Sequence, residues 1–140
     1  MNAWAARLFA KLRRVLPARR APVEDRAALG RWGEDLAARE LRRRGYRVLA
    51  RNQRVGRGEV DLVARQGETV VLVEVKTRRT GAFGEAQDAI STAKARRLVA
   101  LGQRYAQSVG ATDWRIDVVA IDVAPDGSHT VEVIENAVGD

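Results

Sequence analysis

The sequence contains no cysteine and a single histidine, His129. Without cysteine the chain can form no disulfide, no thiolate zinc site and no cysteine nucleophile. One histidine cannot make a multi-histidine metal centre. If the chain binds a metal, the ligands must therefore be carboxylate oxygens, which favour Mg²⁺ or Mn²⁺ over zinc or copper.

Aromatic residues and long apolar runs are also scarce. Aromatics make up 5% of the 140 residues, too few to indicate a stacking platform for single-stranded nucleic acid. No apolar run approaches the ~18 residues of a membrane-spanning helix, so we expect no integral membrane association. The missing cysteines fit a reducing compartment, and we expect a cytoplasmic protein, although absent cysteine fits other compartments too.

Positive charge is abundant but unevenly distributed. The net charge of +7 raises the expectation of a polyanionic partner. Residues 1–25 hold six basic residues against Glu24 and Asp25, which gives +4 and leaves +3 for the rest of the chain. Nearly all the basic residues are arginines, which GC-rich coding can produce without selection for binding. Basicity alone is therefore weak evidence for nucleic acid.

The chain divides into an arm and a domain. Residues 1–16 predict a short amphipathic helix, and Pro17 and Pro22 bracket the basic linker that completes the arm, residues 1–25. The arm is suited to contact membrane headgroups, nucleic acid or a partner protein, or to be a loosely ordered extension. Residues 26–137 have the length and the balance of apolar and charged residues of one globular domain.

The domain's hydrophobic patterns predict alternating helices and strands. Gly45 has the position of a residue that ends a helix. Short connections between the first three strands predict an antiparallel meander. The order αβββαβ with one further strand predicts an α/β fold, a mixed central sheet flanked by helices. The expected helices are 26–44 and 84–108, and the expected strands are 46–52, 59–64, 70–77, 114–123 and 130–135.

Two carboxylates and a lysine stand within apolar strands. Strand alternation places Glu74 and Lys76 on one face, and a short hairpin can bring Asp61 beside Glu74. Adjacent, partly buried carboxylates repel each other and lose solvation, and a divalent cation compensates for both costs. A water on that cation is a better nucleophile, which Lys76 could orient. Glu34, at the border of the first helix's apolar face, could add a further acid.

Each of these residues has a plainer explanation when taken alone. Glu-x-Lys on a strand usually forms an exposed ion pair worth under ~1 kcal/mol. Asp61 could serve solubility at a strand edge, and Glu34 could be a solvated helix residue. Their conjunction on neighbouring elements favours a site.

Four short motifs together make the sequence recognisable: GRWGE at 30–34, GEVDLV at 58–63, VEVKTR at 73–78 and RIDVV at 115–119. With these motifs the chain resembles the YraN-like family of bacterial proteins, of the restriction-endonuclease-like superfamily, which look most like Holliday-junction resolvases. The resemblance implies a restriction-endonuclease-like core and a metal-dependent endonuclease that hydrolyses phosphodiester bonds in DNA, with branched or distorted DNA among the candidate substrates.

The resemblance also implies roles for individual residues. Glu34 corresponds to a helix acid, Asp61 and Glu74 to metal-binding carboxylates, and Lys76 to a catalytic lysine. Ser91 stands four positions after Gln87, where exonuclease-type relatives have tyrosine, which disfavours the exonuclease branch. Resolvase-like relatives act as two-fold dimers, so a homodimer is expected by analogy.

Further residues are candidates for contact with nucleic acid. Arg78 and Arg79, expected in the loop after the catalytic strand, could hold a phosphate or simply be solvated. Gln87 and Lys94 are expected on one side of the second helix, facing the substrate, although Lys94 could extend to solvent instead. Asp117 is expected to pair with an arginine that braces the fourth strand.

Two other functional classes compete with the nuclease. One is a non-catalytic nucleic-acid-binding protein on a nuclease fold, and the other is a partner-binding or membrane-surface adaptor that acts through the arm. The intact set of Asp61, Glu74 and Lys76 argues against the first, because a protein without catalysis would be expected to lose one of them.

Overall fold

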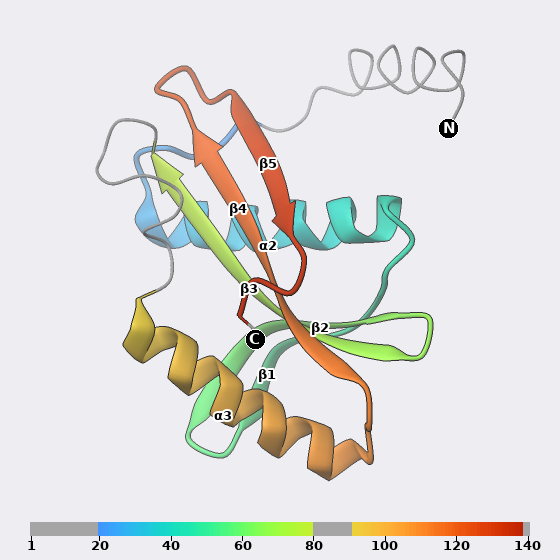
Figure 1. Cartoon of the computed structure of the whole chain (residues 1–140). Helices are drawn as coiled ribbons and strands as arrows, with labels where there is room; N and C mark the ends of the chain where they lie inside the picture. The colour runs from blue at the N-terminus through green and yellow to red at the C-terminus, as the bar shows by residue number, and fades with distance from the viewer. Residues whose placement is uncertain (1–19, 80–90, 139–140) are drawn as a thin grey trace, which may run out of the picture.

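The computed structural model describes residues 20–79 and 91–138. Within these ranges the expected order of helices and strands is confirmed (Figure 1). The elements are α2 (Arg26–Arg43), β1 (Arg47–Val55), β2 (Gly58–Gln66), β3 (Thr69–Arg79), α3 (Thr92–Val109), β4 (Trp114–Val123) and β5 (His129–Ile134).

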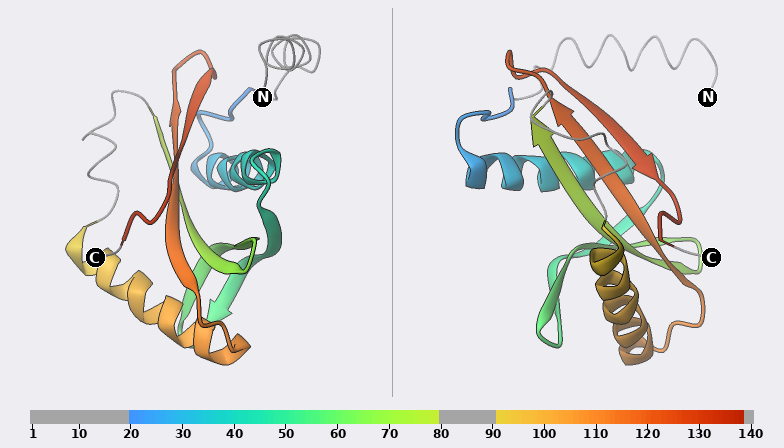
Figure 2. Two further views of the ribbon diagram at one scale, coloured as in Figure 1. Left: turned by 45° about the vertical axis from the view of Figure 1, so that its right-hand side comes forward. Right: turned by 60° about the vertical axis from the view of Figure 1, so that its left-hand side comes forward.

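The five strands form one mixed sheet in the order β1-β2-β3-β4-β5. The predicted antiparallel meander of β1, β2 and β3 is confirmed, and β4 pairs antiparallel with β5. β3 and β4 run parallel, so the chain must cross over between them, and α3 lies on this crossover. Figure 2 shows α2 and α3 on opposite sides of the sheet. The fold is thus the expected α/β arrangement, a mixed central sheet flanked by helices with the element order αβββαβ followed by one further strand.

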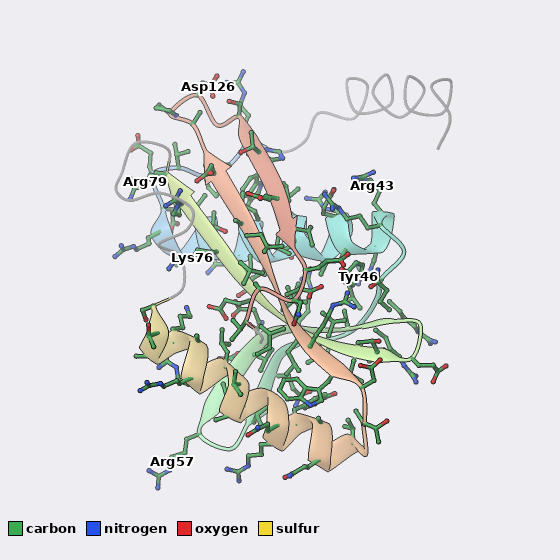
Figure 3. The ribbon with its side chains drawn as sticks, viewed as in Figure 1. Arg43, Tyr46, Arg57, Lys76, Arg79 and Asp126 are labelled. Atoms are coloured by element: carbon green, nitrogen blue, oxygen red, sulfur yellow. The ribbon has the colours of Figure 1, made fainter. Side chains whose placement is uncertain are left out.

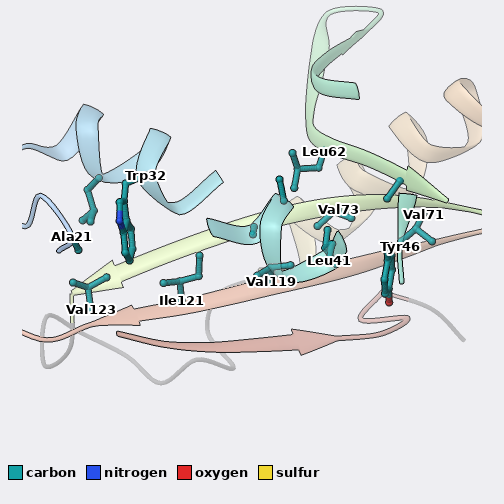
Figure 4. Packing of buried hydrophobic residues seen from close by; sticks show 14 residues of the cluster. Ala21, Trp32, Leu41, Tyr46, Leu62, Val71, Val73, Val119, Ile121 and Val123 are labelled. Carbon is teal, nitrogen blue, oxygen red and sulfur yellow. The ribbon is translucent and has the colours of Figure 1, made fainter. Parts of the chain in front are cut away.

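The larger part of the core lies between α2 and the sheet. Asp25 caps the helix by accepting the N–H of Ala28 at 3.0 Å, and Gly45, at φ +93°, follows its end as predicted. Trp32 and Leu41 of α2 are buried against the strands (Figure 4). On the sheet side the labelled core residues are Leu62, Val71, Val73, Val119, Ile121 and Val123.

α3 covers the other face of the sheet and begins later than predicted. Ser91 has extended backbone (φ −70°, ψ 161°) and caps the helix by accepting the N–H of Lys94 at 3.2 Å. A continuous helix from residue 84 is therefore wrong, because the backbone of Ser91 is not helical. Gly102 lets the helix approach β4 closely, since a Cβ there would lie 2.3 Å from a ring carbon of Trp114.

Asp117 is fully buried on the α2 side of the sheet and braces β4, as predicted. Its carboxylate accepts hydrogen bonds from Arg115 Nε, the Tyr46 hydroxyl and the Asn136 N–H, each at 2.9 Å. Burial and the neighbouring Asp117 raise the pKa of Tyr46 to about 12. Asp117 points away from the face that carries Glu74, so the network is structural.

Only the last residues of the arm are described. Ala21 is buried in the core and donates its N–H to the carbonyl of Gly127 at 3.3 Å, so residues 20–25 follow the body of the domain. The amphipathic helix expected over 1–16 lies outside the described residues. In residues 20–79 and 91–138, neither helix has the length and apolar character needed to cross a membrane.

Candidate active site

The pairing between β2 and β3 stops just before Asp61 and Glu74. The last pair in this direction is Leu62 with Val73, and continuing the register would set Asp61 opposite Glu74. β2 stays paired with β1 as far as Gly58, whereas β3 stays paired with β4. The two strands therefore separate at this point, and the sheet opens beside two carboxylates.

The side chain of Asp61 bridges the opening. Its Oδ2 accepts the backbone N–H of Val75 at 2.8 Å, which fixes the carboxyl group next to β3. The Asp61 carboxyl group also makes a hydrogen bond with the side chain of Glu74. The structure thus brings together the two carboxylates that the sequence placed on neighbouring strands.

This contact has a strong electrostatic consequence. Burial, followed by the charge of Glu74, raises the pKa of Asp61 from 3.8 to about 7, and the Val75 hydrogen bond only partly opposes the change. Glu74 is itself buried, and its Oε1 lies 2.5 Å from the ammonium nitrogen of Lys94. The raised pKa of Asp61 and the ion pair of Glu74 with Lys94 both reflect the crowding of negative charge at this point.

Lys76 lies on the same face as Glu74, as strand alternation predicts. Figure 3 labels it midway along β3. It lines a cavity of about 270 Å³ together with the carboxylates. The residues around this cavity are Gly30, Glu34, Asp61, Glu74, Val75, Lys76, Thr77 and Lys94.

Glu34 lines the cavity from α2, which lies on the side of the sheet opposite α3 (Figure 2). Gly33 allows this approach, because a Cβ at that position would lie 2.0 Å from Thr77 Oγ1. Asp35, the next residue of α2, ties the helix to β1, because it accepts a hydrogen bond from Arg51 Nη1 at 2.6 Å. Burial raises the pKa of Glu34 above its ordinary value, against a hydrogen bond from Asn52.

Asn52 is the site residue that the sequence analysis missed. Its neighbours Arg51 and Gln53 pair with Leu62 and Val60, so Asn52 stands opposite Asp61 on β1. Its backbone is left-handed, with φ +49°, a conformation that asparagine tolerates better than most residues. Its side chain bonds to Glu34. An asparagine at the end of the expected strand 46–52 is unusual and could have drawn attention to this position, but the sequence does not show which residue it contacts.

The candidate nucleic-acid-binding residues are more scattered than expected. Arg78 and Arg79 belong to β3, not to a following loop, because pairing with β4 extends the strand to Arg79. Arg78 Nε donates to Asp122 at 3.2 Å, and Arg79 is exposed at the strand's end. Neither is among the described residues around the cavity. These two arginines therefore lie beyond the carboxylate pair on the same strand.

Gln87 and Lys94 do not share the helix as expected. Gln87 lies outside the described residues, and α3 begins only after Ser91. Lys94, in the first turn of α3, does not extend away to solvent but contacts Glu74. Its placement makes it part of the cavity's charge balance.

The donors in the cavity suit a hydrated divalent cation. Asp61 and Glu74 offer hard oxygen ligands in contact with each other, and their mutual repulsion is what a cation relieves. Among residues 20–79 and 91–138, no three His, Cys, Asp or Glu side chains are grouped to enclose a metal. Two carboxylates with water completing the coordination shell fit Mg²⁺ or Mn²⁺, which usually keep several waters.

Comparison with known proteins identifies related sequences over most of the domain. The model of "Uncharacterised protein family UPF0102" matches residues 33–121, a region that contains Glu34, Asp61, Glu74 and Lys76. A UPF0102 protein of Roseiflexus castenholzii is 50% identical over 101 residues, covering 70% of this chain and 82% of the relative. One of Streptomyces coelicolor is 46% identical over 116 residues, covering 80% and 89%.

The solved structures give a more distant likeness. The structure of Pyrococcus furiosus SfsA in complex with Ca²⁺ matches with a TM-score of 0.40 and 15% sequence identity. The match covers 76% of this chain and 62% of SfsA. A likeness at this distance bears on neither the chemistry nor the ligands of the cavity.

Proposed function

The chain belongs to the UPF0102 (YraN) family, as its motifs predicted, and we propose that it is a metal-dependent nuclease that hydrolyses phosphodiester bonds in DNA. The observation that carries this proposal is the contact between the Asp61 and Glu74 carboxyl groups where β2 and β3 separate. Lys76 follows on the same face of β3, so a cation-binding pair and a fixed ammonium group border one cavity.

Asp61 and Glu74 are the residues that would hold Mg²⁺ or Mn²⁺. When bound, the cation supplies an activated water and neutralises charge on the phosphate. Asp61 would bind the cation through its carboxylate, which the Val75 N–H holds in position. Glu74 would bind it with an oxygen that also contacts Lys94 or with the other oxygen of the same carboxylate.

Lys76 and Glu34 would act on the reacting groups. The ammonium group of Lys76 can donate hydrogen bonds to a phosphoryl oxygen as negative charge grows on it, which lowers the barrier. Glu34, which lines the cavity, would accept a proton from the attacking water. Burial raises its pKa, which makes it a stronger base than an ordinary glutamate.

The test compares the wild-type chain with Asp61→Asn and Lys76→Met. Linear, branched and single-stranded DNA and RNA are incubated with each protein in Mg²⁺, in Mn²⁺ and in EDTA. We expect cleavage of DNA by the wild type only with metal, and at least a ~100-fold loss in both variants, because each removes a group that acts in the transition state. DNA binding should persist in both variants.

The control is Glu132→Gln, an exposed carboxylate on β5 that does not line the cavity and should cleave like the wild type. Cleavage that survives in both site variants would indicate a contaminating nuclease and would refute the proposal. A wild-type chain that binds DNA without cutting any substrate would favour a non-catalytic nucleic-acid-binding protein.

A further inference from the structure

The helix that borders the site carries positive charge without any negative charge. Among its eighteen residues α3 has Lys94, Arg96, Arg97 and Arg104 and no Asp or Glu. α2, of the same length, has five arginines but also Glu34, Asp35 and Glu40, which leaves it at +2 against +4 for α3. Of the two helices, α3 therefore carries the larger and uncompensated positive charge.

Three of these cations run along one side of α3. With 3.6 residues per turn, Lys94, Arg97 and Arg104 (positions i, i+3 and i+10) share a side of the helix. Leu101, on the same side, approaches the β1–β2 hairpin so closely that a Cβ on Gly58 would lie 2.6 Å from its side chain. This side of the helix thus runs from Glu74 to the hairpin.

The hairpin continues the line of positive charge. A Cβ on Gly56 would lie 2.7 Å from the Arg104 guanidinium, so that side chain rests against the turn. Arg57, the next residue, is exposed and projects from the tip of the hairpin beside α3 (Figure 3). We call Arg57, Arg97 and Arg104 the α3 stripe.

The α3 stripe is not neutralised by the protein. All three arginines are exposed, and within the part of the chain that the structure describes none forms an ion pair. Some other arginines are paired: Glu40 contacts Arg43 at 2.6 Å and Arg44 at 3.1 Å. Exposed, unpaired guanidinium groups are well suited to bind phosphate.

We propose that the α3 stripe binds the phosphate backbone of duplex DNA and leads it to the cavity. This inference rests on the proposed nuclease function and deepens it by naming the form of the substrate. Ten residues of helix separate Lys94 from Arg104, about 15 Å at 1.5 Å per residue. That length corresponds to about four phosphates of one strand at 3.4 Å each.

The surroundings of the stripe favour a duplex over a single strand. Proteins that hold single strands stack unpaired bases on exposed aromatic rings. In residues 20–79 and 91–138 the Trp and Tyr side chains are buried or half-buried, at positions 32, 46, 105 and 114. A surface of arginines without such rings is best suited to contact phosphates, and a duplex presents its phosphates with the bases already stacked.

The experiment measures binding as a function of salt. A fluorescent 20-base-pair duplex and the corresponding single strand are titrated in EDTA between 50 and 200 mM KCl with wild type and with Arg97→Gln/Arg104→Gln. Each phosphate contact contributes about 0.9 to the slope of log K against log salt. Because two contacts are removed, we expect the slope for the duplex to be smaller in magnitude by about 1.8 in the double variant, and its affinity to be at least ~10-fold weaker.

Two single variants serve as matched controls. Arg96→Gln changes the neighbouring exposed arginine, about 100° around the helix from Arg97. Arg39→Gln changes an exposed arginine on α2, across the sheet. Both should bind with the wild-type slope. Superimposable circular-dichroism melting curves would show that any loss in the double variant is not unfolding.

An unchanged slope in the double variant, or equal binding of single strand and duplex by the wild type, would overturn the inference. The outcome is separable from the proposed function. If the wild type never cleaves DNA but the double variant has a smaller salt slope, the α3 stripe is supported and the nuclease function is refuted. If the wild type cleaves in Mg²⁺ or Mn²⁺ and the double variant binds with the wild-type slope, the nuclease function is supported and the α3 stripe is refuted.

Discussion

The carboxylate of Asp61 takes the place of a strand partner for Val75. Its Oδ2 accepts the Val75 N–H at 2.8 Å, at a point where β2 has already separated from β3. The opening between the strands would otherwise leave this N–H without its ladder bond. One hydrogen bond therefore both completes the edge of β3 and fixes the carboxyl group that contacts Glu74.

The proximity of Asp61 and Glu74 predicts a dependence of stability on pH. The pKa of Asp61 is raised from 3.8 to about 7 in the folded protein. The protonated carboxyl group therefore contributes its full stabilisation below pH 3.8, and this stabilisation is lost as the pH rises through about 7. Asp61→Asn cannot ionise but retains an oxygen for the Val75 N–H. In EDTA, the variant's free energy of unfolding should exceed that of wild type by more at pH 8 than at pH 5.

Urea denaturation at these two pH values measures the effect. The increase should be about 1 kcal/mol or more, because each unit of pKa difference corresponds to about 1.4 kcal/mol and solvent screening reduces the full value. Glu132→Gln, at an exposed carboxylate, should show the same difference from wild type at both pH values. A difference for Asp61→Asn that does not change with pH would contradict the contact between the two carboxyl groups.

The sequence predicted this part of the site because local rules determine it. Alternation along β3 decides that Glu74 and Lys76 share a face, and a hairpin of tightly connected strands brings Asp61 next to them. Both rules need only residues close in the sequence.

Other features depend on contacts between distant segments and could not be predicted. β3 includes Arg78 and Arg79 because β4, more than 40 residues later, pairs with them, whereas the strand pattern alone had ended at Thr77. The helical pattern predicts too early a start for α3, because the pattern does not show that Ser91 takes an extended backbone and caps the helix. That Lys94 would contact Glu74 follows from how α3 packs on the sheet, which no pattern within the helix specifies.

The close approach of α2 to β3 predicts opposite effects at two glycines of one helix. A Cβ on Gly33 would lie 2.0 Å from Thr77 Oγ1, whereas nothing lies within 4 Å of a Cβ on Gly30. Gly33→Ala should therefore destabilise the protein by ~1–3 kcal/mol through overpacking. Gly30→Ala should be neutral or stabilise it by up to ~1 kcal/mol, because alanine favours the helix.

Chemical denaturation of both variants distinguishes packing from helix propensity. Thr77→Ala removes the hydroxyl that a Cβ on Gly33 would meet, so the double variant Gly33→Ala/Thr77→Ala should recover part of the lost stability. Equal effects of alanine at the two glycines would show that α2 does not need the close contact that brings Glu34 to the cavity.

The ion pair between Lys94 and Glu74 should weaken the binding of a divalent cation by the two carboxylates. The ammonium nitrogen lies 2.5 Å from Oε1 of a buried carboxylate, so it occupies an oxygen that a metal would need and repels the arriving charge. Among the described residues, Lys94 is the only cation that forms an ion pair with either carboxylate, so a divalent ion would meet less competition without it.

Lys94→Met keeps the length of the side chain and removes its charge, so it should bind Mn²⁺ more tightly than the wild type. A gain of about 1.4 kcal/mol would appear as a ~10-fold lower Kd in isothermal titration calorimetry without DNA. Arg96→Met, two residues along α3 and exposed, should leave the Kd unchanged. In EDTA the Lys94→Met protein should also be less stable, because Glu74 stays buried without its partner. An unchanged or weaker Mn²⁺ affinity would mean that Lys94 does not compete for the carboxylates and acts elsewhere.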